Sequence, residues 1–362
     1  MDRVLNFYPG PAALPIDALK EARDEMLNWK NTGMSVMEIS HRSKQYEEVH
    51  NGTQELLKKL FNLPDNFKIL LLQGGASLQF AMIPMNLLKS GETADYIVTG
   101  RFSNNAYKNA KKVTNVNLAC TTEEDGKYFR IPKENEIKVT EGAKYVHLTS
   151  NNTIFGTQWK KFPDYSPVPV IADMSSDILS RKLDFKPFGL IYAGAQKNLG
   201  PAGVTVVIIR EDLIEGSRDD LPDMLSYKTL AGKNSLFNTP SCYGIYIMHK
   251  VLKWVDSHGG LDFIEKQNEE KANMVYGLID KYPDFFISKV EKESRSNMNV
   301  SFRLPNEEME KKFISEAENQ GIIGLKGHRS VGGIRISMYN ANGVKEVKTL
   351  IDYMEDFYKT NG

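Results

Sequence analysis

The sequence predicts an α/β protein with a large domain, built on a mostly parallel seven-stranded sheet between helices, and a smaller α+β domain. Short apolar runs of strand length recur between helix-length or loop segments over residues 69–209. These runs are continuous, which is typical of strands buried on both faces. After Gly259-Gly260 the pattern changes, and roughly 100 residues remain, enough for a small second domain.

The chain opens with an arm and two helices. Prolines and Gly10 crowd the first fifteen residues, which predicts an extended arm. Apolar residues at helical spacing then predict helices over Ile16–Trp29 and Ser43–Phe61. Ser43 is a suitable N-cap for the second helix, and Pro64 stops it.

Seven apolar runs follow, each expected to form one strand. They are Ile69–Leu72, Tyr96–Val98, Val113–Leu118, Tyr145–Leu148, Val168–Ala172, Leu190–Ala193 and Val204–Ile209. Alternation of strands with helices indicates a mostly parallel sheet covered by helices. The order of the strands cannot be read from the sequence.

The smaller domain is expected to follow a helix over Cys242–Trp254 that leads out of the sheet. Its predicted elements are Leu261–Ile279, Asn299–Leu304, Glu307–Gln320, Gly333–Ser337 and Val344–Tyr358. We therefore expect a large domain over residues 16–259, and a small domain made of residues 260–362 together with the arm, residues 1–15.

Composition excludes several classes of protein. The 362 residues are 41% apolar and 25% charged, near the average for globular proteins. Lys and Arg (46) balance Asp and Glu (46), so no basic surface for nucleic acid is expected. Two cysteines cannot build a disulfide framework or a four-thiolate metal site, and we expect no metal. We see no signal peptide and no membrane-spanning run, and we expect a cytosolic protein.

The first candidate site is the segment Gln73–Ser77, which follows an apolar run and precedes a helical pattern. Its glycines allow close approach of the backbone, and the first amides of a helix point at an anion bound there. The segment lacks the Walker and GxGxxG patterns. An ordinary strand-to-helix turn would look the same.

Two further candidates are Asp173 and Lys197. Asp173 ends an apolar run, where its carboxylate is expected to point into the crevice beyond the sheet; a helix cap or a buried structural acid would fit equally. Lys197 lies between two apolar runs and is flanked by small residues. A lone loop lysine is most often solvated.

Together these three features suit pyridoxal phosphate. That cofactor needs a lysine for a Schiff base, an acid to pair with its ring nitrogen, and a cradle for its phosphate.

The motifs resemble those of the class V aminotransferases, a branch of the fold-type I pyridoxal phosphate enzymes, and they do so along the whole chain. They are Asn6–Ala12, Ser40–Ser43, Gly74–Ser77, Ala172–Ser176, Ala195–Pro201, Asn238–Ser241 and Gly327–Ser330 followed by Arg335. The resemblance implies transfer of an amino group between glutamate and 3-phosphohydroxypyruvate, giving O-phosphoserine for serine synthesis. It leaves room for a phosphorylated hydroxythreonine precursor of vitamin B6 as a second substrate.

The resemblance also assigns roles to residues. Lys197 would hold the cofactor and move the proton, and Asp173 would pair with the ring nitrogen. The other expected cofactor contacts are Ala76, Ser77 and Gln196 at the phosphate, Phe102 stacked on the ring, Thr153 near the ring hydroxyl, and Asn238 and Thr239 from a neighbouring subunit. The last pair implies a homodimer.

Substrate binding is expected to use a second set of cationic residues. Arginine suits both carboxylate and phosphate because it binds them through two hydrogen bonds. The resemblance places Arg335 on the α-carboxylate and places His41, Arg42, His328 and Arg329 around the distal anion. Some relatives carry an arginine in the glycine-rich loop, where this chain has Ala76-Ser77.

Two other readings stay open. One is another class V reaction, either a different transamination or cysteine desulfuration, the second of which would need a mobile cysteine near the site. A binding module without turnover would need neither Lys197 nor Asp173.

Overall fold

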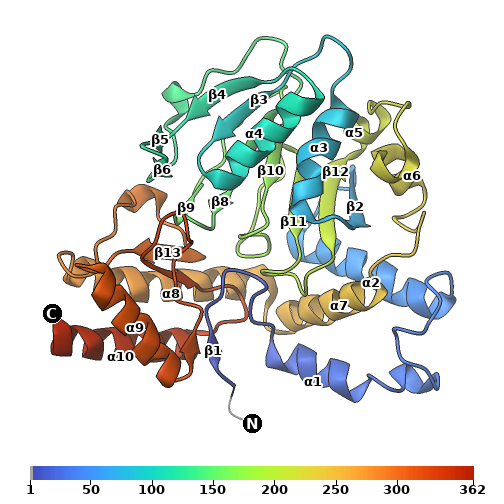
Figure 1. The fold of residues 1–362 in the computed structure, drawn as a ribbon. Helices are drawn as coiled ribbons and strands as arrows, with labels where there is room; N and C mark the ends of the chain where they lie inside the picture. Colours follow the sequence, from blue (N-terminus) through green and yellow to red (C-terminus); the bar gives the residue numbers. More distant parts are fainter. Residues whose placement is uncertain (1–2) are drawn as a thin grey trace.

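The computed structural model describes residues 3–362, and its centre is a twisted sheet with helices on both faces (Figure 1). Within these residues seven strands pair in the order β2-β12-β11-β10-β7-β3-β4. Their bounds are β2 Phe67–Leu72, β3 Asp95–Val98, β4 Asn117–Thr121, β7 Val146–Thr149, β10 Val170–Asp173, β11 Phe188–Gly194 and β12 Thr205–Arg210. The predicted fold class is confirmed.

One of these strands runs against the others. β12 is antiparallel to both β11 and β2, while the remaining pairs are parallel. The segment between β11 and β12 carries Lys197 and holds no helix. A parallel return needs a crossover of about a dozen or more residues, so this short connection brings β12 back antiparallel.

Alternate strand residues enter different cores, as expected for a sheet covered on both sides. In β2, Ile69 and Leu71 pack in the cluster that contains α2 and α7. Leu70 and Leu72 pack in the cluster that contains α3 and α4. The helices are α1 Ile16–Asp24, α2 Lys44–Phe61, α3 Gly75–Leu87, α4 Arg101–Val113, α5 Glu211–Glu215, α6 Tyr227–Gly232 and α7 Cys242–Ser257.

Two predicted boundaries are wrong. The helix predicted to reach Trp29 ends at Asp24. Leu27 is 85% exposed, so the apolar face of the helix does not extend to that residue, and Trp29 begins a separate short turn. The strand predicted from Val113 begins at Asn117, because Val113 still belongs to α4. β4 is an edge strand with Leu118 exposed, so it lacks a fully apolar run.

The C-terminal elements form a second core. They are α8 Gly260–Lys281, β13 Asn299–Phe302, α9 Glu307–Asn319, β14 Ile322–Ile323, β15 Ile334–Ser337 and α10 Val344–Asn361. β13 pairs antiparallel with β15. The N-terminal arm joins this core, since β1 (Leu5–Asn6) pairs with β14 and Phe7 is buried among residues of α8 to α10.

We propose the domain division that the sequence indicates, with residues 16–259 in one unit and residues 260–362 plus the arm in the other. Residues 1–2 lie outside the described residues. The separate apolar clusters support this division, although Leu261 and Ile264 at the start of α8 pack with the large unit.

The remaining elements are short. They are the hairpins β5 Glu123–Glu124 with β6 Lys127–Tyr128 and β8 Asn151–Asn152 with β9 Thr157–Gln158, and the 3-10 turns Trp29–Asn31, Glu134–Glu136, Asp223–Leu225 and Lys292–Ser294. Over residues 3–362, none of the helices has the length and apolar character needed to cross a bilayer. The same residues bring together no group of three or more His, Cys, Asp or Glu side chains suited to a metal ion.

Candidate active site

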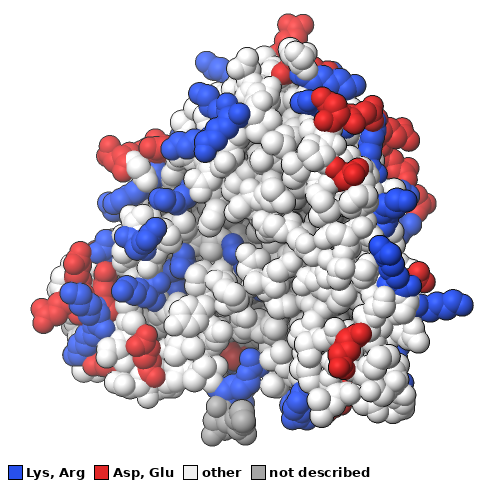
Figure 2. Space-filling view, turned by 45° about the vertical axis from the view of Figure 1, so that its right-hand side comes forward, with Lys and Arg blue, Asp and Glu red and all other residues white. Residues whose placement is uncertain are grey.

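A cavity of about 290 Å³ lies beyond the carboxyl ends of the sheet strands, where doubly wound folds bind their ligands. Its lining comes from both units: Pro9, Gly10, Gly75, Ala76, Ser77, Phe80, Phe102, Thr149, Asn151, Thr153, Ile154, Asp173, Ser175, Ser176, Gln196, Lys197, His328 and Arg335. In the space-filling view a cationic group is visible in a recess whose surrounding atoms are mostly uncharged (Figure 2).

Lys197 is held inside this cavity in the connection between β11 and β12. It is only 9% exposed, and its Nζ donates a hydrogen bond to Thr153 Oγ1 at 2.6 Å. The Nζ also lies 5.6 Å from the centre of the Phe102 ring. Burial lowers the pKa of Lys197 to about 8, although Asp173 opposes this effect. A lysine of this kind is partly neutral near physiological pH and can act as a nucleophile.

The N-terminal arm closes over Lys197. Gly10 has a φ of +131°, and a Cβ at that position would lie 3.3 Å from Lys197 Cγ. The arm is tied down beside it, because Ala12 N donates to Gln196 O at 2.9 Å. Glycine therefore meets both the left-handed backbone and the close approach.

Asp173 is the last residue of β10 and is 4% exposed. Its Oδ1 accepts a hydrogen bond from Ser175 N at 2.9 Å, and within residues 3–362 it forms no ion pair with Lys or Arg. Burial raises its pKa, while the bonds from Ser175 and the charge of Lys197 act against this rise. A buried carboxylate of this kind suits a cationic ligand group.

The glycine-rich turn between β2 and α3 has the form of an anion cradle. Gly74 has a φ of +90°, and a Cβ there would lie 2.4 Å from Leu78 Cδ2. Ala76 and Ser77 occupy the first turn of α3 and face the cavity. The first amides of a helix have no partner within it and favour negative charge, so a phosphate group fits here.

A second cationic region of the cavity is contributed by the small unit. Arg335 on β15 is 6% exposed, its Nε is buried without a hydrogen-bond partner, and within residues 3–362 it forms no ion pair. Burial lowers its pKa. His328 also lines the cavity, and its pKa is lowered by burial and by the charges of Arg335, Arg101 and Arg329. Such a cluster suits an anionic substrate.

Not all predicted site residues meet in this cavity. Lys197, Asp173, Ala76, Ser77, Phe102, Thr153, Gln196, His328 and Arg335 line it, whereas His41, Arg42, Arg329, Asn238 and Thr239 do not. Asn238 instead lines a neighbouring cavity of about 190 Å³. Its Nδ2 lies 3.4 Å from Gln73 Oε1, and Gln73 Nε2 donates to Thr239 O at 3.0 Å.

The structure adds residues that sequence reasoning missed. Asn151, Ser175 and Ser176 line the cavity, and Asn151 Nδ2 donates to Ser176 Oγ at 2.8 Å and to Asn299 Oδ1 at 2.7 Å. The two serines follow Asp173 directly, which could have marked them. Nothing in the sequence marked Arg101.

The model of the family described as Aminotransferase class-V matches residues 4–350. The chain belongs to this family. It is 53% identical over 361 residues to the phosphoserine aminotransferase of Halalkalibacterium halodurans, covering 100% of both chains. It is 52% identical to that of Geobacillus kaustophilus, covering 99% of each.

Solved structures agree with these sequence relatives. The phosphoserine aminotransferase from Bacillus circulans subsp. alkalophilus superposes with a TM-score of 0.97 at 50% identity, covering 100% of each chain. A pyridoxal phosphate-bound phosphoserine aminotransferase from Trichomonas vaginalis gives 0.93 at 38% identity, covering 98% of this chain and 100% of that one. The resemblance inferred from the motifs is confirmed.

Proposed function

We propose that the protein is a phosphoserine aminotransferase. It uses pyridoxal phosphate to move an amino group between glutamate and 3-phosphohydroxypyruvate, giving O-phosphoserine and 2-oxoglutarate. The observation that carries this proposal is one cavity that holds a buried Lys197, a buried Asp173, the turn at Ala76-Ser77 and Arg335, which has no ion-pair partner among residues 3–362. The full-length relatives with this name support it.

The chain's own residues fit the cofactor. Pyridoxal phosphate supplies an aldehyde and a ring that accepts electrons from the substrate. Lys197 would hold the aldehyde carbon and, when free, carry the proton between the substrate α-carbon and the cofactor. Thr153 holds the Lys197 amine by its hydrogen bond. Phe102, whose ring centre lies 5.6 Å from the same amine, would stack on the cofactor ring. Asp173 would hold a proton on the ring nitrogen.

The remaining cavity residues would fix the anionic groups. Ala76 and Ser77, with Gln196, would bind the cofactor phosphate at the start of α3. Arg335 would bind the substrate α-carboxylate through its buried guanidinium, and His328 would stand near the distal phosphate with Arg329. Because Ala76-Ser77 carries no charge, binding of the substrate's distal phosphate would depend on cationic residues such as His328 and Arg329.

A thiol reaction has little support. Cys120 and Cys242 are both free, and neither lines the cavity. Amino transfer is therefore favoured over cysteine desulfuration.

The experiment that tests the proposed reaction compares O-phosphoserine with serine. We expect O-phosphoserine to convert the cofactor-loaded protein to its amino form, read by visible absorbance, at a concentration about 10²-fold lower than serine, because two charge-assisted hydrogen bonds contribute about 3 kcal/mol. Glutamate should give the same spectral change. An equal response to O-phosphoserine and serine would contradict a phosphate site, and no response to any of them would contradict an aminotransferase.

We further propose a homodimer in which each cavity is completed by the partner. Two observations support it. Asn238, Thr239, His41 and Arg42 lie outside their own chain's cavity. In addition, exposed apolar side chains of the kind that interfaces cover lie near these residues. Met34, Met37 and Phe237 precede them closely in sequence, and Met224 lines the same small cavity as Asn238.

Mixing two inactive variants tests this arrangement. Lys197→Ala removes the amine, and Asn238→Asp sets a carboxylate against the phosphate. If Asn238 serves the partner's cavity, a mixed dimer has one intact site out of two, and activity should return after the variants are unfolded and refolded together. If Asn238 serves its own chain, every site stays defective, and the absence of recovery would contradict the proposal.

A further inference from the structure

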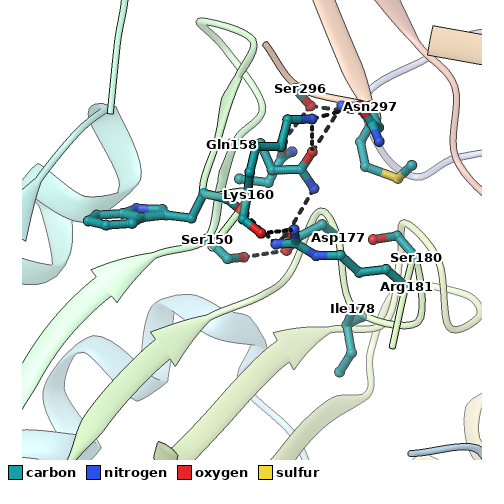
Figure 3. A network of polar contacts seen from close by, with 12 residues as sticks. Ser150, Gln158, Lys160, Asp177, Ile178, Ser180, Arg181, Ser296 and Asn297 are labelled. Atoms are coloured by element: carbon teal, nitrogen blue, oxygen red, sulfur yellow. Dashed lines mark hydrogen bonds and ion pairs between the residues drawn. The ribbon is translucent and has the colours of Figure 1, made fainter. Parts of the chain in front are cut away.

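Asp177 is a buried carboxylate that none of the roles above uses. It is 4% exposed and lies four residues beyond Asp173, in the turn that follows β10 (Figure 3). Buried acids are uncommon unless they are paired or hydrogen-bonded, so its surroundings need an explanation.

The Asp177 carboxylate is held from three directions. The Ser150 hydroxyl contacts Oδ1, Gln158 Nε2 donates to Oδ2 at 3.1 Å, and Arg181 Nη2 lies 3.6 Å from the same oxygen (Figure 3). At that distance Arg181 contributes charge but no hydrogen bond. Arg181 is itself fixed, because it donates to the Lys160 and Trp159 carbonyl oxygens.

Ser150 lies between Asp177 and Asp173 and contacts both residues. Its backbone N donates to Asp173 O at 2.9 Å, and its hydroxyl lies 3.0 Å from the same oxygen. The hydroxyl has one proton, so it shares that proton between Asp177 and the Asp173 carbonyl. The end of β10, which carries the Asp173 carboxylate, is thus anchored through Ser150 to Asp177.

The same turn also contacts the segment that carries Lys197. Asn198 Nδ2 donates to Ile178 O at 3.0 Å, so the residues that follow Lys197 and Asp177 are bonded to each other. When ionised, Asp177 also raises the pKa of Lys197 against the effect of burial. Burial raises the pKa of Asp177 itself, while the charge of Arg181 and the hydrogen bonds from Ser150 and Gln158 act against that rise and favour the ionised form. In a weakly polar interior such a charge acts over several ångströms.

We propose that Asp177 is a positioning residue that anchors Asp173 through Ser150 and places a carboxylate beside the segment that carries Lys197. This inference rests on the proposed function, in which Lys197 holds pyridoxal phosphate. The charged and titratable groups that bear on Lys197 are Asp173, Arg335 and Asp177. Those that bear on Asp177 are Arg181, Lys160, Lys197 and Asp173.

Asp177→Asn tests the charge while keeping the shape of the side chain. The cofactor-loaded protein, without substrate, is titrated with base and followed by visible absorbance. We expect the apparent pKa of the Lys197–cofactor chromophore to fall by about half a unit or more, because a negative charge that favours the cationic form is gone. A role limited to packing would change thermal stability and leave this titration where it was.

Asp212→Asn is the matched control, since Asp212 pairs with Arg210 on the surface and its loss should not move the titration. If Asp177→Asn yields no soluble protein, Asp177→Ser removes the same charge and keeps a hydrogen-bonding group. A titration identical to the parent in the Asp177 variant would overturn the inference and leave the proposed function intact. A parent protein that forms no chromophore with the cofactor would overturn both.

Discussion

Replacing Lys197 by alanine should lower the rate of amino transfer by about 10⁴-fold or more, because the chain would lose both the amine that holds the cofactor and the base that moves the proton. The variant should bind pyridoxal phosphate without a covalent link. Borohydride reduction of the loaded parent, followed by peptide mapping, should find the label on Lys197 and find none there in the variant. A labelled parent peptide that lacks Lys197 would contradict the assignment.

The pH dependence of cofactor attachment is a second test of the role of Lys197. Burial lowers the pKa of Lys197 to about 8, so its neutral form becomes the major one above that pH. We expect the rate of attachment to rise with pH below about 8 and to level off above it. Lys186→Ala, which removes an exposed lysine paired with Asp164, should leave both the rate and the profile unchanged.

The second large effect is expected for Asp173→Asn, with a loss of about 10³-fold in turnover. Two unit charges about 4 Å apart interact by about 4 kcal/mol at an effective dielectric constant near 20, equivalent to about three pKa units. Asparagine keeps the shape of the side chain but cannot hold the proton on the ring nitrogen. Steady-state kinetics with O-phosphoserine measures the effect, and turnover at the parent rate would refute the role.

The effect of Asp173→Asn on stability can be measured separately from its effect on turnover. Burial raises the pKa of Asp173 above its unfolded value. The cofactor-free protein therefore loses stability as pH rises through the interval between the two values. Asparagine removes that loss, so cofactor-free Asp173→Asn should be at least as stable as the parent at neutral pH. Thermal unfolding of both proteins without cofactor checks this expectation.

Much of the fold could be predicted because buried parallel strands leave continuous apolar runs. The seven predicted runs each correspond to a strand of the central sheet. The errors fall where burial is one-sided or interrupted. Leu118 lies exposed on an edge strand, and Leu27 lies exposed beyond the end of α1, so hydrophobic spacing misplaced both boundaries.

The site was predictable in part for a different reason. Lys197, Asp173 and Ala76-Ser77 lie at or just beyond the carboxyl ends of strands that share one edge of the sheet, so the site could be predicted without knowing the strand order. The hydrogen bonds from Asn151 to Ser176 and to Asn299 join residues up to 148 positions apart, and no local pattern encodes them. Asp177 was missed because a carboxylate in a turn is ordinarily solvated; its burial depends on the neighbouring β8–β9 hairpin and on Arg181.

The arm that lines the cavity sets an order for events during synthesis. Pro9 and Gly10 are made long before β14, yet β1 has no partner until Ile322 and Ile323 of β14 have been made. Chains fold largely as they are produced, with N-terminal parts first, so the sheet can form while this leading segment waits. The pocket around Lys197 is then completed by the arm and β14 together, after every strand of the central sheet has been translated.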